Sequence, residues 1–176
     1  MCIRDREHEL QRCSRMDGQL AVLVLDIDHF KSINDRYGHA AGDTALRHYA
    51  QVVQNAVRAS DRFGRLGGEE FVLLMYDCDP ARALIHAQRV CDALRDTPLY
   101  LQGGEVQMTT SGGLASYQPG DSADVILARA DVALYRAKEQ GRDRVEMAFS
   151  GRGAGRVQVG GVAANAPLAA QQASGD

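Results

Sequence analysis

Near-continuous apolar stretches alternate along the chain with stretches in which apolar residues recur every three or four positions. The run Leu20–Asp26 (LAVLVLD) is almost wholly apolar and rich in branched residues, which predicts a buried central strand. Asp43 is a candidate cap for a long helix. The apolar face of that helix consists of Leu46, Tyr49, Ala50, Val53 and Val57. Gly67-Gly68 separates two strand-like segments, 61–66 and 71–76, which predicts a hairpin.

The second half of the chain continues the same alternation. Its predicted elements are a helix from Asp79-Pro80, strand material over Val106–Ala115, a helix capped by Asp121 or Ser122 that runs to about Gln140, and a short strand over Arg144–Met147. Gly141 suits the end of the last helix. The order of elements predicts an α+β fold, in which helices pack on the faces of a mixed sheet.

Composition narrows the classes of protein that fit this pattern. The chain has 176 residues, 45% of them hydrophobic, and a net charge of −3, so we expect one ordinary domain with no nucleic-acid partner and no membrane contact. No apolar run approaches the roughly 18 residues of a membrane span. The scattered cysteines form no Cys-x-x-Cys pair, which indicates neither a disulfide framework nor a structural metal and fits a cytoplasmic location.

Both ends of the chain differ from its middle. Residues 1–6 are a charged leader without periodicity, which we interpret as non-native or disordered. Residues 150–176 are rich in Gly, Ala and Gln and poor in large apolar side chains, which predicts disorder. We therefore expect the domain itself to occupy residues 7–149.

Candidate chemistry begins at Asp26-Ile27-Asp28, where the buried strand ends. If the strand continues through them, Asp26 and Asp28 project to the same side, and a divalent cation would satisfy both carboxylates. The same pattern also fits a helix cap followed by a solvated acid.

A second group of acids lies in the predicted hairpin, in the sequence Gly67-Gly68-Glu69-Glu70. Paired glycines let a ligand approach the backbone closely, and adjacent acids on a tight turn favour a nearby cation or base. Beside Asp26, this turn would complete an oxygen-ligand site for Mg²⁺, with Mn²⁺ as the alternative ion. Taken alone, the motif also fits an ordinary polar turn.

Three motifs in order give the chain a specific resemblance. They are DIDHFKSINDRYGHAAGD (Asp26–Asp43), RASDRFGRLGGEEF (Arg58–Phe71) and ALYRAKEQGRDRV (Ala133–Val145). Together they resemble the GGDEF family of diguanylate cyclases in its GGEEF form. The resemblance implies a mainly antiparallel central sheet flanked by helices, like the palm-like core of adenylyl cyclases and polymerases. It also implies Mg²⁺-dependent condensation of two GTP molecules into cyclic di-GMP, with release of pyrophosphate, by a symmetric homodimer.

The resemblance assigns roles to individual residues. The metal ions would be held by Asp26, the carbonyl of Ile27 and Glu69, with Glu70 as a further ligand or supporting acid. Glu69 and Glu70 are the candidate catalytic residues, and Glu69 is the favoured acceptor of the ribose 3′-hydroxyl proton. The GTP-binding residues would be Lys31, Asn34, His39, Asp43, Gly67, Gly68, Lys138 and Arg142. Among these, Asn34 and Asp43 match the guanine readers, and the cations match the triphosphate site. Lys138 and Arg142 also suit a helix C-terminus without any ligand.

A further match is Arg58-x-x-Asp61, with five residues between Asp61 and Gly67. In the family this spacing marks an inhibitory site for the product cyclic di-GMP, although an Arg and an Asp three positions apart also form local ion pairs. The chain shows nothing like the segment D-x-L-T-G-L-x-N-R with which family domains usually begin, so we expect an N-terminally incomplete domain that starts within the first helix at His8–Ser14. The alternative function is therefore a non-catalytic receptor for cyclic di-GMP or GTP.

Overall fold

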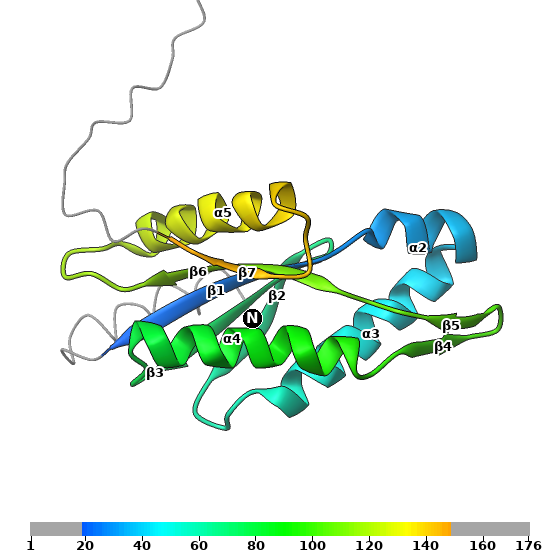
Figure 1. Cartoon of the computed structure of the whole chain (residues 1–176), viewed down its shortest axis with the longest axis horizontal. Coiled ribbons are helices and arrows are strands. Elements are labelled where there is room, and N and C mark those ends of the chain that lie inside the picture. Colours follow the sequence, from blue (N-terminus) through cyan, green and yellow to red (C-terminus); the bar gives the residue numbers. More distant parts are fainter. Residues whose placement is uncertain (1–18, 149–176) are drawn as a thin grey trace, which may run out of the picture.

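A computed structural model describes residues 19–148, which form a five-stranded sheet with helices on both faces (Figure 1). The strands follow the spatial order β2-β3-β1-β6-β7. Their bounds are β1 Leu20–Ile27, β2 Arg62–Gly67, β3 Glu70–Tyr76, β6 Thr110–Ser116 and β7 Val145–Met147. Only the β6–β7 pair of this sheet is parallel. The predicted α+β fold with a mainly antiparallel sheet is confirmed.

Helices cover β1 from both sides, which explains its unbroken apolar sequence. Leu23 and Leu25 pack into a core with α3 (His39–Ala56) and α4 (Pro80–Arg95), whereas Val22 and Val24 pack under α5 (Ala123–Glu139). Figure 1 shows α5 on one side of the sheet and α3 with α4 on the other. Since alternate residues of a strand point to opposite faces, every position of β1 is buried.

Helix caps agree with the sequence pattern at two of three positions. The side chain of Asp79 accepts a hydrogen bond from the Arg82 backbone N–H, and that of Ser122 accepts one from Val125. The expectation for Asp43 is wrong, because α3 begins at His39, directly after Gly38, which has a φ of 82°. Asp43 therefore lies inside the helix.

Three elements were not predicted from the sequence. Helix α2 spans Phe30–Tyr37, and the strands β4 (Leu99–Leu101) and β5 (Gly104–Val106) form a separate hairpin. The strand predicted from Val106 begins only at Thr110. Helix α2 is only eight residues long and buries just Phe30 and Ile33, so it offers too few apolar positions to reveal a helix in the sequence.

The predicted leader, the helix start at His8–Ser14 and the predicted tail all lie outside the described residues. Within residues 19–148, no helix combines the length and the apolar character that a membrane crossing requires.

Candidate active site

The end of β1 brings an acid, a lysine and the hairpin turn together. Asp26 lies in register with Glu70 of β3 on one side and with Ser111 of β6 on the other. The backbone N–H of Ile27 reaches the carbonyl of Glu69 in the turn, at 3.4 Å. From α5, the Nζ of Lys138 approaches the Oδ2 of Asp26 to 2.9 Å. Segments that are far apart in sequence thus meet at the end of the central strand β1. We call this group of Asp26, Glu69, Glu70 and Lys138 the acidic edge.

Electrostatics distinguish Glu69 from an ordinary surface acid. Partial burial raises the pKa of the Glu69 carboxyl above its usual value, and the charges of Asp26 and Glu70 raise it further. Lys138 offsets part of that rise. The Glu69 carboxylate is therefore a stronger base than a solvated glutamate, and added positive charge would relieve its repulsion from Asp26.

The residues at this edge fit a divalent cation of the Mg²⁺ class. Asp26 and Glu69 supply carboxylate oxygens and Ile27 a backbone carbonyl, and Mg²⁺ uses few protein ligands beside phosphates and water. Across residues 19–148, however, no group of three or more His, Cys, Asp or Glu side chains is arranged to hold a metal ion. The turn is open for a ligand, because a Cβ added at Gly67 or Gly68 would have no neighbour within 4 Å.

Asp28 has a different role from Asp26. Strand β1 ends at Ile27, so the condition for the two acids to share one side of a strand is not met. The Asp28 Oδ1 accepts a hydrogen bond from Ser111 Oγ at 2.6 Å. Its Oδ2 accepts bonds from Thr109 Oγ1 at 2.8 Å and from the Asp143 backbone N–H at 3.1 Å. Protein donors thus satisfy this buried carboxylate.

The hairpin turn is held by a side chain that the sequence analysis did not single out. Arg65 Nε donates to the Gly68 carbonyl at 2.8 Å, and its Nη2 donates to the same oxygen. The register of β2 against β3 shifts between Arg65 and Gly67, and Gly68 has a φ of 51°. Glycine adopts this left-handed conformation at the lowest cost, so the turn itself favours the second glycine of the motif.

The expected guanine readers lie on adjoining helices. Asn34 of α2 rests against Gly42 of α3, where an added Cβ would come within 2.0 Å of the Asn34 Oδ1. Because Gly42 has no side chain, Asn34 can approach α3 closely at the position next to Asp43. Asp43 itself lines a pocket of about 330 Å³ together with Arg47, Phe63, Arg65 and Phe71.

The expected triphosphate cations are distributed around the same end of the sheet. Lys31 on α2 is exposed. His39, which is expected to shape the guanine end of the site, is exposed at the start of α3. Arg142 is exposed in the turn after α5, with a φ of 64°. Lys138 alone among these residues contacts Asp26.

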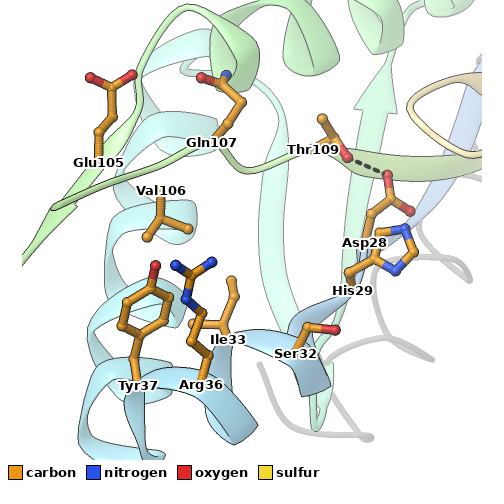
Figure 2. Close-up of a pocket in the computed structure, with 10 residues that line it drawn as sticks. All are labelled: Asp28, His29, Ser32, Ile33, Arg36, Tyr37, Glu105, Val106, Gln107 and Thr109. Atoms are coloured by element: carbon orange, nitrogen blue, oxygen red, sulfur yellow. Dashed lines mark hydrogen bonds between the residues drawn. The ribbon is translucent and has the colours of Figure 1, made fainter. Parts of the chain in front are cut away.

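A second pocket, of about 310 Å³, lies between α2 and the segment that contains β5 (Figure 2). Ile33, Arg36 and Tyr37 come from α2, and Figure 2 shows Glu105 and Gln107 on the facing segment. The Arg36 guanidinium carbon lies 5.1 Å from the Tyr37 ring centroid. Asp28 and Thr109 close one end of this pocket, whereas Asp26, Glu69 and Lys138 do not line it.

Arg58 and Asp61 are separated from the acidic edge. Asp61 is buried, and its carboxylate accepts bonds from the Arg58 backbone N–H at 3.3 Å and from Ser60 Oγ at 3.4 Å. The Arg58 guanidinium instead contacts the ring of His86. No ion pair joins the Arg58 and Asp61 side chains in the described structure, so a helix-end salt bridge does not explain the pattern. Burial and the nearby Arg58 and Arg89 charges lower the pKa of His86.

Supporting residues were harder to find from sequence than acids. The hydroxyl run Thr109-Thr110-Ser111 was a usable signal, since such a run beside an acidic strand end offers donors. The ion pair of Arg95 Nε with Asp143 Oδ2, at 2.8 Å, gave no such signal, because Arg95 lies outside the three motifs and 48 positions from Asp143.

Comparisons with known proteins identify the family and the fold of this chain. Residues 4–144 match the family model described as "Diguanylate cyclase, GGDEF domain". The chain is 40% identical over 146 residues to the diguanylate cyclase DgcP of Pseudomonas aeruginosa, a match that covers 81% of this chain and 21% of DgcP. The chain thus spans about a fifth of that relative.

Solved structures give the same result. The GGDEF domain of YfiN (TpbB) from Pseudomonas aeruginosa superposes with a TM-score of 0.77 at 37% identity, covering 83% of this chain and 92% of that one. The GGDEF domain of DgcB from Caulobacter crescentus, solved in complex with c-di-GMP, gives a TM-score of 0.78 at 29% identity, covering 82% and 86%. Both likenesses cover more than four fifths of this chain.

Proposed function

The chain belongs to the GGDEF family of diguanylate cyclase domains, and we propose that it condenses two GTP molecules into cyclic di-GMP with release of pyrophosphate. The cluster of Asp26, Glu69 and Lys138 at the end of β1 carries the proposal. It combines two acids, one of them with a raised pKa, and a cation at an open glycine turn. A module that only binds nucleotide has no need for such paired acids.

The acids of this edge would hold the metal ions. Asp26, the Ile27 carbonyl and Glu69 are the proposed ligands, and Glu70 is a further ligand or supporting acid. Bound Mg²⁺, or Mn²⁺ in its place, would supply positive charge against the charge that develops on the α-phosphate and the leaving pyrophosphate. Glu69 is the proposed base for the ribose 3′-hydroxyl, and its raised pKa suits it to accept that proton.

The bound GTP would extend from the glycine turn toward α2 and α3. Lys31, Lys138 and Arg142 are the proposed triphosphate cations, with Gly67 and Gly68 giving the phosphates access to the backbone. Asn34 and Asp43 are the proposed guanine readers, and His39 shapes that end of the site. The Asp43 carboxylate only accepts hydrogen bonds, which matches the N1–H and N2–H₂ donors of guanine. Adenine has no donor at either of these positions.

Catalysis needs two copies of the domain. Each proposed site holds one GTP, and in each the 3′-hydroxyl attacks the α-phosphate of the GTP on the other protomer. Each attack forms one phosphodiester bond and breaks one bond to pyrophosphate. A symmetric pair of protomers would close the ring with two such attacks. We expect specific activity to rise with protein concentration if the pair is weak.

Arg58 and Asp61 are the proposed inhibitory site for the product. The guanidinium of Arg58 is turned away from Asp61 and the residue is exposed, so the guanidinium can meet a ligand, whereas Asp61 would have to exchange its present hydrogen bonds for that ligand. An arginine can bond a phosphate or a guanine edge with two parallel hydrogen bonds. The c-di-GMP bound to DgcB supports product recognition by a domain of this fold. We place the whole reaction in the cytoplasm.

The direct test is to incubate the purified protein with GTP and Mg²⁺ and to separate the nucleotides by chromatography. We expect cyclic di-GMP and pyrophosphate from GTP, no cyclic dinucleotide from ATP, and no product from the matched Glu69→Gln variant. Equal use of ATP and GTP would contradict the guanine readers. Binding of cyclic di-GMP without any turnover of GTP would instead support the receptor alternative.

A further inference from the structure

Tyr49 and Thr110 form a buried hydrogen-bonded pair directly beneath the acidic edge. The Tyr49 side chain is 0% exposed, and its hydroxyl lies 3.0 Å from Thr110 Oγ1. Thr110 Oγ1 in turn donates to the backbone carbonyl of Asp26 at 2.8 Å. Since a threonine hydroxyl has one proton, and that proton goes to Asp26, the Tyr49 hydroxyl must be the donor to Thr110. The bonds therefore run in one direction, from Tyr49 through Thr110 to Asp26.

The end of this relay is the peptide group between Asp26 and Ile27. Its carbonyl accepts the Thr110 hydroxyl, while its N–H donates to the Glu69 carbonyl at 3.4 Å. The relay from inside the core and the contact from the hairpin thus add to the pairing of Asp26 with Ser111 of β6 in fixing the plane of this peptide. That plane sets the direction of the Asp26 side chain and of the chain at Ile27, both of which the proposed function uses as metal ligands.

Tyr49 also contacts the hairpin through its ring. The centroids of Tyr49 and Phe71 lie 4.7 Å apart, and Phe71 stacks on Phe63 at 5.4 Å. Phe71 follows Glu70 in β3, so the same tyrosine contacts the hairpin strand and, through Thr110, the end of β1. Tyr49 packs in the core on the α3 and α4 face of the sheet, whereas Asp26 pairs with Lys138 of α5 on the opposite face.

We infer that Thr110 and Tyr49 are positioning residues, which hold the Asp26–Ile27 peptide in the orientation that the metal site requires. The effect on metal binding rests on the proposed function, whereas the hydrogen-bond relay itself is a property of the metal-free protein. Both side chains are completely buried, so neither can contact a substrate. Hydrogen bonds behind a metal ligand commonly change metal affinity or activity by about 10- to 100-fold.

Two substitutions at Thr110 separate the hydroxyl from the packing. Thr110→Val keeps the branched shape and removes the hydroxyl donor. Thr110→Ser keeps the hydroxyl donor and removes the methyl group. The matched stability control is Val53→Ala, one turn along α3 from Tyr49 in the same core, which removes buried carbon but no hydrogen bond. Tyr49→Phe removes the first donor of the relay while its ring can still pack on Phe71.

The first measurement is amide hydrogen exchange in the metal-free protein. We expect the Ile27 amide to exchange about tenfold faster in Thr110→Val, because the peptide loses the hydrogen bond from the Thr110 hydroxyl. The exchange rate of the Ile27 amide is compared with the rates of the amides in the centre of β3. In Thr110→Ser and Val53→Ala this ratio should equal that of the parent. An unchanged Ile27 amide in Thr110→Val would overturn the inference, whatever the protein does with nucleotides.

The second measurement is Mn²⁺ binding in the presence of a non-reactive GTP analogue, followed by the spin-resonance signal of free Mn²⁺. We expect the affinity to fall about tenfold in Thr110→Val and less in Tyr49→Phe, with Thr110→Ser and Val53→Ala near the parent value. An equal loss in Val53→Ala would reduce the relay to ordinary core packing and overturn the inference. If the parent itself bound no Mn²⁺, the proposed function would fail, while the exchange result would still decide whether the relay fixes the peptide.

Discussion

Asp26 and Asp28 lie at the same strand end, and each side chain is largely buried, but their surroundings differ completely. Among the described residues, Asp26 has one charged partner, Lys138, whose side chain is 33% exposed. Asp28 accepts three hydrogen bonds from Ser111, Thr109 and the backbone of Asp143. The first arrangement can exchange its partner for a ligand at little cost, whereas the second cannot. Burial of an acid therefore does not identify a functional site, and the number and kind of its partners does.

The largest effect that we expect concerns the stability of the Asp28 side. Asp28→Ala leaves three donors without their acceptor and should lower the free energy of unfolding by about 3 kcal/mol. Asp26→Ala, the matched control, should cost less than about 1 kcal/mol, because Lys138 is partly solvated and pairs of this kind contribute little. Urea unfolding of both variants measures the difference. Equal losses would remove the distinction between the two acids.

The next effect concerns the exchangeable partner of Asp26. Lys138→Met should raise the KM for GTP about tenfold, because one charge-assisted hydrogen bond to phosphate is worth about 1.5–3 kcal/mol. Stability should change little, and Lys138→Arg should retain most of the affinity. Steady-state kinetics give the comparison. A KM for GTP that is the same in the methionine variant and the parent would show that Lys138 serves only Asp26.

A smaller effect should come from the turn that carries Arg142. Asp143 in this turn bonds Asp28 through its backbone and Arg95 through its carboxylate. Arg95→Met should raise the KM for GTP about threefold, because exposed pairs contribute up to about 1 kcal/mol. Asp92→Asn, which removes the other partner of Arg95, is the control and should leave the KM unchanged. An unaltered KM in Arg95→Met would mean that the turn holds its shape without the ion pair between Arg95 and Asp143.

The sequence predicted the sheet better than it predicted the site. The unbroken apolar run of β1 predicted a strand buried on both faces, and Gly67-Gly68 predicted the hairpin. Helix α2 was missed because it is short and buries only two of its eight residues. The D-I-D pattern could not distinguish Asp26 from Asp28, since their partners lie on β6, on α5 and in the turn after α5. Such long-range pairing is set by the fold and leaves no local periodicity.

The smallest effect on the initial rate should come from the residues outside the acidic edge. Arg58→Ala should leave the initial rate of GTP turnover near the parent value and remove the plateau that appears as cyclic di-GMP accumulates. His86→Ala, the matched control, keeps the arginine and should keep the plateau. Progress curves with and without added product measure this. Equal inhibition of Arg58→Ala and the parent would return Arg58 and Asp61 to a structural role.

The most direct test of the central claim is the rate of cyclic di-GMP formation by Asp26→Asn. This substitution retains the shape of the side chain and removes the charge that the proposed metal site needs, while the Asp28 network remains intact. We expect a protein that unfolds at nearly the parent temperature and forms no detectable product from GTP and Mg²⁺. Formation of cyclic di-GMP at the parent rate would contradict the assignment of the β1 edge as the metal-dependent catalytic site.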